Sequence, residues 1–527
     1  MNIRLAVAAA AAAALLVLLC GCRKENTEVV AIGMYPAEQT AETYSEIWDV
    51  LWRGMNQNYV GWEIEDFDWD ESREIYTAQF EELDKRVDSL NDSATADSDA
   101  LKEVADDAEE LFHEIFGRFH DGHLYLEYVD YATGKRIGFM PADARNSARQ
   151  DYEDVVKMSK SYYCEDGGEF SEDFRFISVP VIMCEEILKK QAEMQQDYER
   201  LSGLEELTPN EQLILEALEK ALPVLETMST YMEKSPFYAS SLYRIYQSRL
   251  SETDIVLLQV EYDLPDTNFK QDDVAQVELG KTKDNIIYYR LSQFILPHFE
   301  MLEAPASDLT ATDSLIRNTY FEALMQFHDK VYKMHSEGTL KGIILDVRNN
   351  PGGLVDDLKW MAGLFYEGER YHPGTMKMKN GLGRLDYSVS VPLRMDCYGS
   401  NTEDIDEPMV ILANAQTVSC AEITTVSVKQ HTNGISMGMR TWGGGNKLLS
   451  DATYNSLLNY AGCIGVSGET PVYAYIPFVL TSYYGLGVID GVGVAPDIEI
   501  RYDAAQYAAT GRDNQFERAL AYIREGK

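Results

Sequence analysis

Two apolar runs of strand length, each followed by a turn and a helical segment, constrain the fold more than any other feature of the chain. The first run, 342–347, ends in the turn 348–353 with the sequence RNNPGG. The second run, 409–413, leads through a polar turn into a helical segment that starts at Ser419 and ends at 433–434. Runs without polar alternation are typical of strands buried on both faces, so the repeated strand–helix order predicts a parallel α/β core.

The turns after these two strands are candidate parts of one site. Turns at the carboxyl edge of the same sheet can lie side by side. Gly352 and Gly353 lack side chains, so backbone N–H groups there can approach a ligand closely. Ser419 stands at a helix start, where amides and the helix dipole stabilise a developing negative charge. Ser419 is therefore a candidate nucleophile. Candidate oxyanion-hole donors are the amides of Gly352, Gly353 and Cys420.

Each of these turns also has an explanation without catalysis. Ser419 and Glu422 form an S-x-x-E capping box, which starts a helix by itself. The sequence Asn350-Pro351-Gly352-Gly353 is common in tight turns. Capping and nucleophilic attack are compatible roles for Ser419, so both interpretations stay open.

The composition excludes one class of partner. The 527-residue chain has 46 basic and 87 acidic residues and a formal net charge of −41. Such a surface repels phosphate backbones, so nucleic acid is not an expected partner. The sequence has no CxxC motif and no histidine-rich cluster, so it does not predict a zinc site. Attack by a serine hydroxyl requires no metal or cofactor. The odd number of cysteines beyond Cys22 gives no disulfide framework, although one pair stays open. These cysteines are Cys164, Cys184, Cys397, Cys420 and Cys463.

The N-terminus predicts export and a lipid anchor. One positive charge at Arg4 precedes an apolar run, 5–19, which is too short for a membrane span and fits a secretory signal. The following residues resemble a bacterial lipobox with cleavage before Cys22 and lipid on its thiol. We therefore expect a lipoprotein signal peptide over 1–21 and a tether over 22–42. The protein would be anchored to a bacterial membrane at the periplasmic face or the cell surface, without spanning it. An ordinary signal peptide cut elsewhere is the alternative.

The rest of the chain divides into three predicted parts. Apolar residues at helical spacing up to about Phe119, followed by an alternating strand over 124–128, predict an N-terminal helical domain, 43–139. Residues 140–282 are predicted to form a mainly helical insertion. Residues 283–527 are predicted to form the α/β core.

The insertion shows helix signals but no chemistry. Thr208 and Glu211 form a capping box before an acidic helical segment, in which Pro223 is expected to kink or divide the helix. Solvated charges over an apolar stripe indicate structure or contact with a partner. A scaffold lipoprotein that acts through residues 140–282 is therefore one function compatible with the sequence.

Four motifs in the second half of the chain, taken in order, carry a family resemblance. They are 345–353 (LDVRNNPGG), 417–422 (TVSCAE), 440–445 (RTWGGG) and 491–498 (GVGVAPDI). They resemble motifs of the S41 serine peptidases, the tail-specific and tricorn-like proteases. The resemblance implies a crotonase-like (ClpP/crotonase-type) α/β core with an N-terminal helical domain. It also implies that Ser419 is the nucleophile of an endopeptidase acting on peptides or proteins without a cofactor.

The resemblance fails at one catalytic position. Processing members of the family use a Ser–Lys dyad, and Gly444 stands where that lysine would be. Lys447 substitutes only if its loop is rearranged, because a base must come within about 3 Å of the hydroxyl. The tricorn-like branch instead uses a histidine from the preceding domain. The segment Asp121-Gly122-His123 resembles its D-G-H sequence, which implies His123 as general base.

The remaining members of such a site are less clear from the sequence. A lone histidine is by default structural, and His113 and His120 compete with His123 but have no family match. Alignment on G-V-x-P-D places the acidic member at Asp490, where the family more often has glutamate; a turn aspartate is the alternative. Tricorn has a serine before its histidine, and here that position is Gly122.

These observations predict an exported serine endopeptidase with Ser419, His123 and Asp490 as catalytic residues. Its alternative is a non-catalytic relative that binds peptides or other ligands, because the family lysine is replaced by Gly444. The Gly-rich carboxylate-binding loop of a PDZ module is not recognisable, so recognition of C-terminal tails is not predicted.

Overall fold

The computed structural model describes most of the chain after the tether. The described residues are 40–92, 98–152, 158, 170, 174–265, 275–296, 310–362, 364, 366–380, 383–401, 404–446 and 463–526. The predicted signal peptide, Cys22 and Lys447 lie outside them. Within the described part of the chain, no helix is long and apolar enough to cross a membrane.

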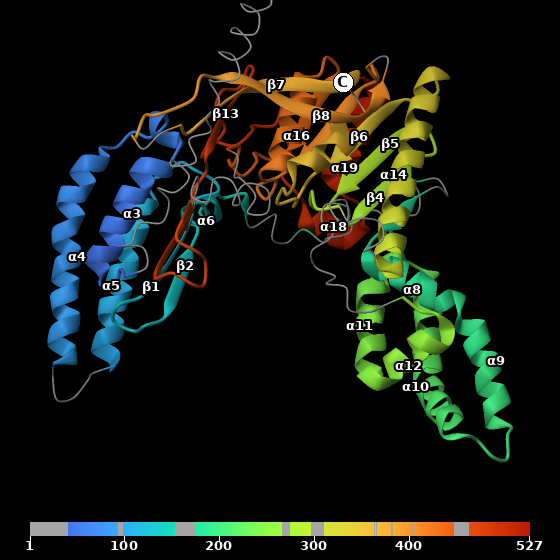
Figure 1. Ribbon diagram of the computed structural model, residues 1–527. Coiled ribbons are helices and arrows are strands. Elements are labelled where there is room, and N and C mark those ends of the chain that lie inside the picture. The colour runs from blue at the N-terminus through green and yellow to red at the C-terminus, as the bar shows by residue number, and fades with distance from the viewer. Residues whose placement is uncertain are drawn as a thin grey trace, which may run out of the picture. The chain divides into compact units, whose positions relative to one another are not determined.

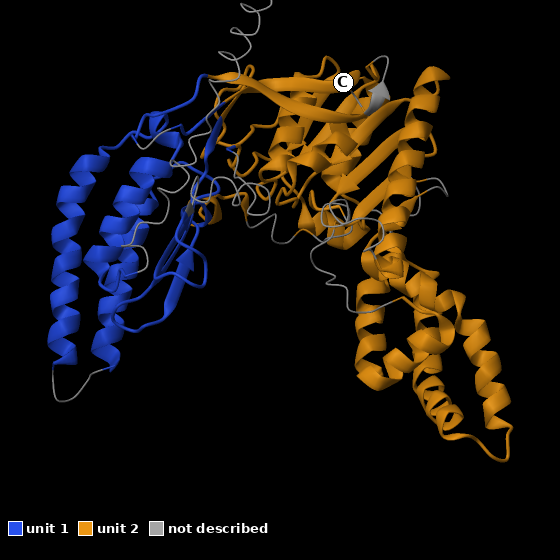
Figure 2. Cartoon of the chain, viewed as in Figure 1, with its two compact units in different colours: residues 1–143, 377–389, 446–480 blue, residues 144–376, 390–445, 481–527 orange. Residues whose placement is uncertain are grey.

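The chain forms two compact units (Figure 2). Unit 1 is built from Met1–Asp143, Lys377–Val389 and Asn446–Leu480. Unit 2 is built from Ala144–Met376, Ser390–Gly445 and Thr481–Lys527. Unit 1 thus takes two segments from the predicted α/β core, because those segments pair with or pack on elements that are distant in the sequence.

Unit 1 contains the predicted N-terminal helices, and this prediction is confirmed. They are α3 (Tyr44–Asn58), α4 (Trp69–Asn91) and α5 (Ser98–Phe116), seen in blue in Figure 1. Thr43 and Asp68 cap the first two with side-chain oxygens. The indole rings of Trp48 and Trp69 meet edge to face at 5.4 Å between centroids, so α3 and the start of α4 share one aromatic core.

A four-stranded antiparallel sheet completes unit 1. Its order is β11 (Cys463–Ile464), β12 (Val472–Tyr475), β1 (Tyr125–Val129) and β2 (Arg136–Phe139). Leu126 is opposite Ala474 on one side and Phe139 on the other. The sequence predicts β1 from its alternation, but not its pairing with a strand almost 350 positions later.

Unit 2 is organised on a seven-stranded sheet that confirms the α/β class. The order is β14 (Ile498–Glu499), β10 (Gly434–Gly438), β9 (Met409–Ala413), β6 (Gly342–Asp346), β5 (Ile286–Leu291), β4 (Val277–Lys281) and β3 (Arg175–Ile177). The first five strands are parallel, whereas β4 and β3 are antiparallel to their neighbours. All residues of β5, β6 and β9 are buried, and β6 and β9 lie in the two apolar runs that predict the parallel core.

Helices and a second sheet surround this core. The helices are α6 (Pro141–Ser147), α14 (Ala311–Ser336), α15 (Leu358–Ala362), α16 (Cys420–Gln430), α18 (Ala504–Thr510) and α19 (Asn514–Glu525). A three-stranded sheet has the order β13 (Val479–Tyr483), β7 (Gly368–Met378) and β8 (Val391–Asn401). The helical segment predicted after the turn 348–353 is shorter than a full helix, because it consists of a 3₁₀ turn, Val355–Asp357, and α15 before β7 begins.

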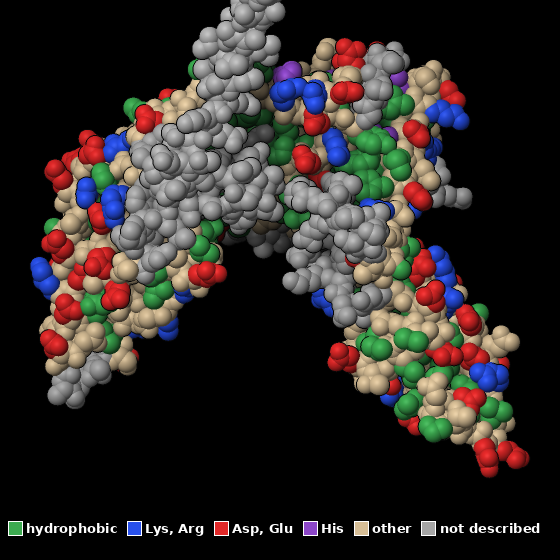
Figure 3. Space-filling model, in the orientation of Figure 1, with side chains coloured by type: hydrophobic (Ala, Val, Ile, Leu, Met, Phe, Trp, Pro, Cys, Tyr) green, Lys and Arg blue, Asp and Glu red, His purple; other side chains and the backbone are tan. Residues whose placement is uncertain are grey.

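Within the predicted insertion, 140–282, residues 179–262 form a group of helices, at the lower right of Figure 1. The strands β3 and β4, which also fall within 140–282, belong instead to the core sheet. The helices are α8 (Val179–Lys189), α9 (Gln191–Ser202), α10 (Pro209–Met232), α11 (Ala239–Arg249) and α12 (Glu252–Tyr262). They follow β3 and precede β4, so both ends of the group are fixed in the sheet. Thr208 makes the predicted capping box, and α10 continues through Pro223 without being divided. Figure 3 shows acidic side chains on this group, as its composition predicts.

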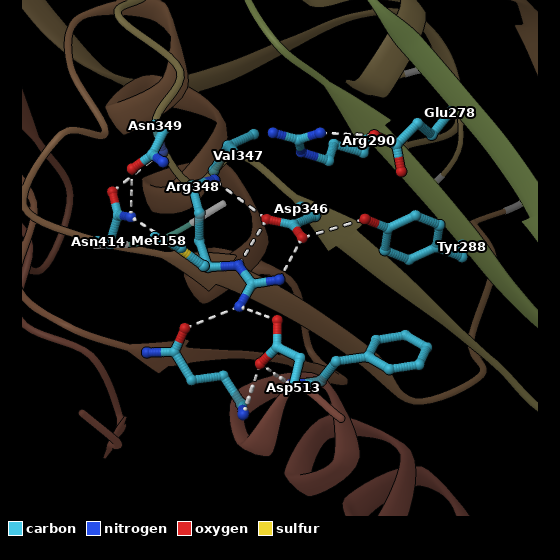
Figure 4. A network of polar contacts seen from close by, with 12 residues as sticks. Met158, Glu278, Tyr288, Arg290, Asp346, Val347, Arg348, Asn349, Asn414 and Asp513 are labelled. Atoms are coloured by element: carbon cyan, nitrogen blue, oxygen red, sulfur yellow. Dashed lines mark hydrogen bonds and ion pairs between the residues drawn. The ribbon is translucent and has the colours of Figure 1, made fainter. Parts of the chain in front are cut away.

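A buried ionic cluster joins the end of β6 to the C-terminal helix (Figure 4). The guanidinium of Arg348 donates to both carboxylate oxygens of Asp346, at 2.9 and 2.6 Å. Its Nη1 donates to Asp513 at 2.7 Å and to Gln515 at 2.8 Å. Burial opposes ionisation of Asp346, but the adjacent guanidinium lowers the pKa of that carboxyl below its usual value. Since Asp513 caps α19, the cluster holds this helix against the strand that leads to Gly352.

We predict that Arg348→Met destabilises the protein by about 3–5 kcal/mol, because it leaves buried carboxylates without their cation. Asp346 and Asp513 are the carboxylates concerned. Urea unfolding followed by tryptophan fluorescence measures the loss. Arg394→Met is the matched control, because Arg394 is exposed on β8. Equal midpoints for the two variants would contradict the prediction.

Candidate active site

Ser419 occupies a strained turn between β9 and α16. Its backbone has φ 55° and ψ −119°, a conformation that costs a non-glycine residue about 1–3 kcal/mol. Sharp strand-to-helix turns of this kind present a nucleophilic side chain clear of the backbone. The turn is held from the β6 side, since Val418 donates to the Asn350 carbonyl at 2.9 Å and Thr417 Oγ1 to the Val347 carbonyl at 2.8 Å.

The structure brings the two predicted turns together. A Cβ atom added to Gly352, which has φ +93°, would lie 2.6 Å from Ser419 Cβ, so this approach requires glycine. Asn349 and Asn414 connect the same turns through two hydrogen bonds, at 3.0 and 2.7 Å, which are drawn in Figure 4. The carboxyl ends of β6 and β9 therefore place Gly352 beside Ser419, as the parallel sheet predicts.

The three candidate donors of the oxyanion hole differ in their bonding. The amide of Gly352 donates to Asn350 Oδ1 at 2.8 Å, so it is already engaged within its own turn. Among the described residues, none accepts a hydrogen bond from the amide of Gly353. Cys420 Sγ donates to the Gly353 carbonyl at 3.1 Å, which holds the residue after the nucleophile against Gly353. The amides of Gly353 and Cys420 are therefore the better pair of donors.

Glu422 is a central residue that the sequence suggested only as a helix cap. Its carboxylate is fully buried. Oε1 accepts from Thr441 Oγ1 at 2.5 Å and from the Gly443 amide at 2.8 Å. Oε2 accepts from the amides of Gly444 and Ser419, at 2.7 and 3.1 Å. Burial raises the pKa of this carboxyl, and the four donated hydrogen bonds oppose that effect. Glu422 thus joins the nucleophile turn to the loop after β10.

We predict that Glu422→Gln costs about 2–4 kcal/mol of stability and lowers peptidase activity. The new amide NH₂ would face two N–H or O–H donors, and each unsatisfied buried group costs about 1–3 kcal/mol. Chemical unfolding and peptide turnover measure the two effects. Glu219→Gln, at an exposed position of α10, is the control with the same chemical change. Unchanged stability in Glu422→Gln would contradict this role.

Gly444, which stands at the position of the lysine in processing members of the family, contributes through its backbone. The amide of Gly444 is one of the donors to Glu422. The neighbouring Gly443 has φ +93°, and a Cβ atom there would meet backbone nitrogens of the 491–493 turn at 3.0–3.1 Å. This loop is thus built around glycine, and a base for Ser419 has to come from another segment.

Asp490 lies in unit 2 at a turn that is bonded to the same loop. Its exposed fraction is 2%. The adjacent Gly491 donates to the Gly443 carbonyl at 2.9 Å. Burial, and then the negative charge of Asp490, raise the pKa of Tyr483 far above its usual value. The fold thus gives Asp490 a buried place near Tyr483, and its catalytic role stays a prediction.

His123 lies in unit 1, in the loop between α5 and β1. The buried carboxylate of Asp121 accepts from the amides of His123 and Leu124, at 2.7 and 2.9 Å, and from Asn446 Nδ2 at 3.1 Å. Nδ1 of His123 is buried and makes no hydrogen bond to any described residue. Burial lowers the pKa of the imidazole, opposed by the nearby Asp121 charge. Burial thus favours the neutral imidazole, and Asp121 fixes the loop that carries it. The role of His123 as a base stays a prediction.

The two competing histidines are explained by other contacts. His120 Nδ1 lies 2.9 Å from Glu65 Oε2, and its amide also donates to that carboxylate. The ring of His113 packs on Phe139, with 4.1 Å between centroids. Within unit 2, His335, Asp406 and Glu407 have ligand atoms close enough to hold a metal ion, but His335 already pairs with Glu407 at 2.8 Å.

Comparisons with known proteins find similarity to peptidases over part of the chain. Residues 314–500 match the model of Peptidase family S41. A CtpA-like serine protease of Staphylococcus haemolyticus is 27% identical over 208 residues, 36% of this chain and 39% of that protein. One of Staphylococcus aureus is 32% identical over 176 residues, 33% of this chain and 30% of that protein. The chain thus spans less than two fifths of the length of these relatives.

A solved structure from Parabacteroides merdae, described as a peptidase, is 14% identical with a TM-score of 0.44. That comparison covers 91% of this chain and 96% of the other. The matched residues, 314–500, include Gly352, Gly353, Ser419 and Asp490, but not His123. Over residues 314–500, the chain is therefore similar to peptidase family S41.

Proposed function

We propose that the protein is a serine peptidase that hydrolyses peptide bonds through an acyl-enzyme. The Ser419 hydroxyl attacks the peptide carbonyl carbon while the neutral imidazole of His123 takes its proton. The resulting oxyanion accepts hydrogen bonds from the amides of Gly353 and Cys420. The tetrahedral intermediate collapses as His123 protonates the leaving amine, and an ester on Ser419 remains.

Hydrolysis of that ester completes the cycle. His123 takes a proton from water, whose oxygen attacks the ester carbonyl, and the second tetrahedral intermediate expels the Ser419 oxygen. Asp490 has the proposed role of the acidic member that stabilises the charged state of the site. Export and attachment through a lipid on Cys22 are also part of the proposal, and they rest on the sequence of the first 22 residues.

The observation that carries this proposal is the strained backbone of Ser419 directly beside Gly352. A helix cap alone has no need of a positive φ, because cap residues ordinarily have extended backbone. The cost of about 1–3 kcal/mol is better explained by presentation of a reactive side chain. The amide of Gly353, which donates to no described residue, supplies a group that an oxyanion needs.

A fluorophosphonate probe tests the proposal directly. The full-length protein should be labelled, and peptide mapping should place the adduct on Ser419. A known serine hydrolase treated in the same way is the positive control. If that control is labelled and this protein is not, the peptidase proposal is wrong.

The second candidate function is peptide or ligand binding without turnover. It is favoured by Gly444, whose backbone amide is committed to Glu422 where processing members carry the lysine base. Binding without turnover requires that no base reaches Ser419. Peptides that bind to the protein but are not hydrolysed, together with absent probe labelling, would support this candidate.

A further inference from the structure

Unit 2 contains a pocket whose charge is opposite to that of the whole chain. It has a volume of about 500 Å³ and lies between the segments 145–151, 440–442 and 491–501. Four arginines line it: Arg145, Arg149, Arg440 and Arg501. The two acidic residues in its lining are Asp151 and Glu499. The formal balance of four positive and two negative charges is +2, on a chain with a net charge of −41.

One of these arginines builds the wall. Arg149 pairs with the Asp151 carboxylate through Nε and Nη2, at 3.0 and 2.8 Å. Its Nη1 also donates to the Thr441 carbonyl at 2.8 Å, and its Nη2 to the Arg440 carbonyl at 2.6 Å. Arg149 therefore fixes the segment 440–441, and its charge is balanced by Asp151.

Arg440 is in a different situation. Its Nη1 donates to the Val492 carbonyl at 3.2 Å, which leaves the positive charge uncompensated. Within the described residues, Arg440 forms no ion pair, and the residue is exposed. A planar guanidinium of this kind binds carboxylates through two parallel hydrogen bonds. The pocket thus offers an unused anion-binding group on a wall that Arg149 holds in place.

The pocket adjoins the segments that build the candidate site. Thr441 follows Arg440 and donates to Glu422, which in turn accepts from the Ser419 amide. Trp442 lines the pocket, and its amide donates to the Thr417 carbonyl at 3.0 Å. On the other side, Val492 lies two positions after Asp490. The pocket and the turn that carries Ser419 are therefore built on the same connected segments.

We propose that this pocket binds the carboxylate side chain of an aspartate or glutamate in the substrate, a few residues from the bond that is cut. This inference deepens the proposed function and rests on it in one respect: the bound peptide is a substrate only if the protein is a peptidase. The net negative charge of the chain repels acidic peptides at long range. A preference for an acidic side chain therefore has to come from local attraction to Arg440. The selection weakens as ionic strength rises, because salt screens an exposed charge.

Binding to the Ser419→Ala protein tests the pocket without requiring turnover. The probes are fluorescent peptides with amidated C-termini that differ only in glutamate or glutamine at one position, scanned on both sides of the scissile bond. At one or more positions the glutamate peptide should bind about five- to tenfold more tightly than its glutamine partner. Adding Arg440→Gln should bring the two affinities together, and adding Arg440→Glu should make the glutamine peptide the tighter binder, because like charges repel. Adding Arg394→Gln, an exposed change outside the pocket, should keep the ratio.

Other results would overturn the pocket while leaving the peptidase proposal intact. Equal affinities for glutamate and glutamine peptides at every position would do so. A preference that survives Arg440→Glu would also do so, as would one that appears only with a free C-terminal carboxylate. Conversely, a protein that selects glutamate through Arg440 but leaves the fluorophosphonate probe unreacted would retain the pocket and lose the peptidase function.

Discussion

Peptide hydrolysis is expected to fall about 10⁴-fold or more when Ser419 is replaced by alanine, since removal of the nucleophile ends covalent catalysis. The fold should be retained, because the amide of residue 419 still donates to Glu422. Turnover of a fluorogenic peptide and fluorophosphonate labelling measure the loss. Ser336→Ala, at the exposed end of α14, is the control and should keep both signals.

The strain at Ser419 gives this experiment a second arm. Ser419→Gly should be as inactive as the alanine variant but more stable than it, by about 1 kcal/mol, because glycine adopts a φ of 55° without cost. Urea unfolding compares the two variants. Equal stability would show that the turn stores no strain, and retained hydrolysis in either variant would remove Ser419 from the mechanism.

Replacement of His123 by alanine is expected to lower kcat/KM by about 10²- to 10⁴-fold, the range for loss of a general base. Added imidazole should restore part of the activity, which a merely structural histidine would not allow. His113→Ala is the control and should keep the activity of the wild type. Equal losses for both variants, or no loss for His123→Ala, would assign the base elsewhere.

The pH dependence provides an independent check on His123. Burial lowers its pKa below the ordinary value of about 6.5, so the imidazole stays neutral at pH values where an exposed histidine is protonated. A base works only in its neutral form. The acid limb of kcat/KM should therefore lie below pH 6.5 in the wild type. An acid limb above that value would contradict the assignment.

The sequence predicts the parts of the fold whose pattern is local. β6 and β9 are mostly apolar because both faces of the sheet are covered, whereas β5 also contains Arg290, which pairs with Glu278. The buried residues of α14 recur at helical spacing. The β7–β8 hairpin escaped prediction because two register shifts, between residues 368 and 370 and between 371 and 374, interrupt its alternation. Pairing between distant strands leaves no local signal.

The candidate site also has features that the sequence predicts and features that it does not. The approach of Gly352 to Ser419 follows from two parallel strands with neighbouring carboxyl ends. The engagement of the Gly352 amide was also predictable, since an asparagine two positions earlier commonly accepts such a bond. The four donors to Glu422 were not predictable, because three of them come from the loop after β10, whose path depends on the turn at 491–493.

The construction of unit 1 from three segments sets the order in which the protein becomes complete during synthesis. β1 is made early, but its partner β12 emerges almost 350 residues later. Until then the inner edge of β1 has unpaired N–H and C=O groups, and an open edge of this kind recruits strands from other chains. A fragment that ends before residue 463 keeps that edge open permanently. Premature termination therefore yields an aggregating species, and a nascent chain needs its edge shielded until β12, Val472–Tyr475, is made.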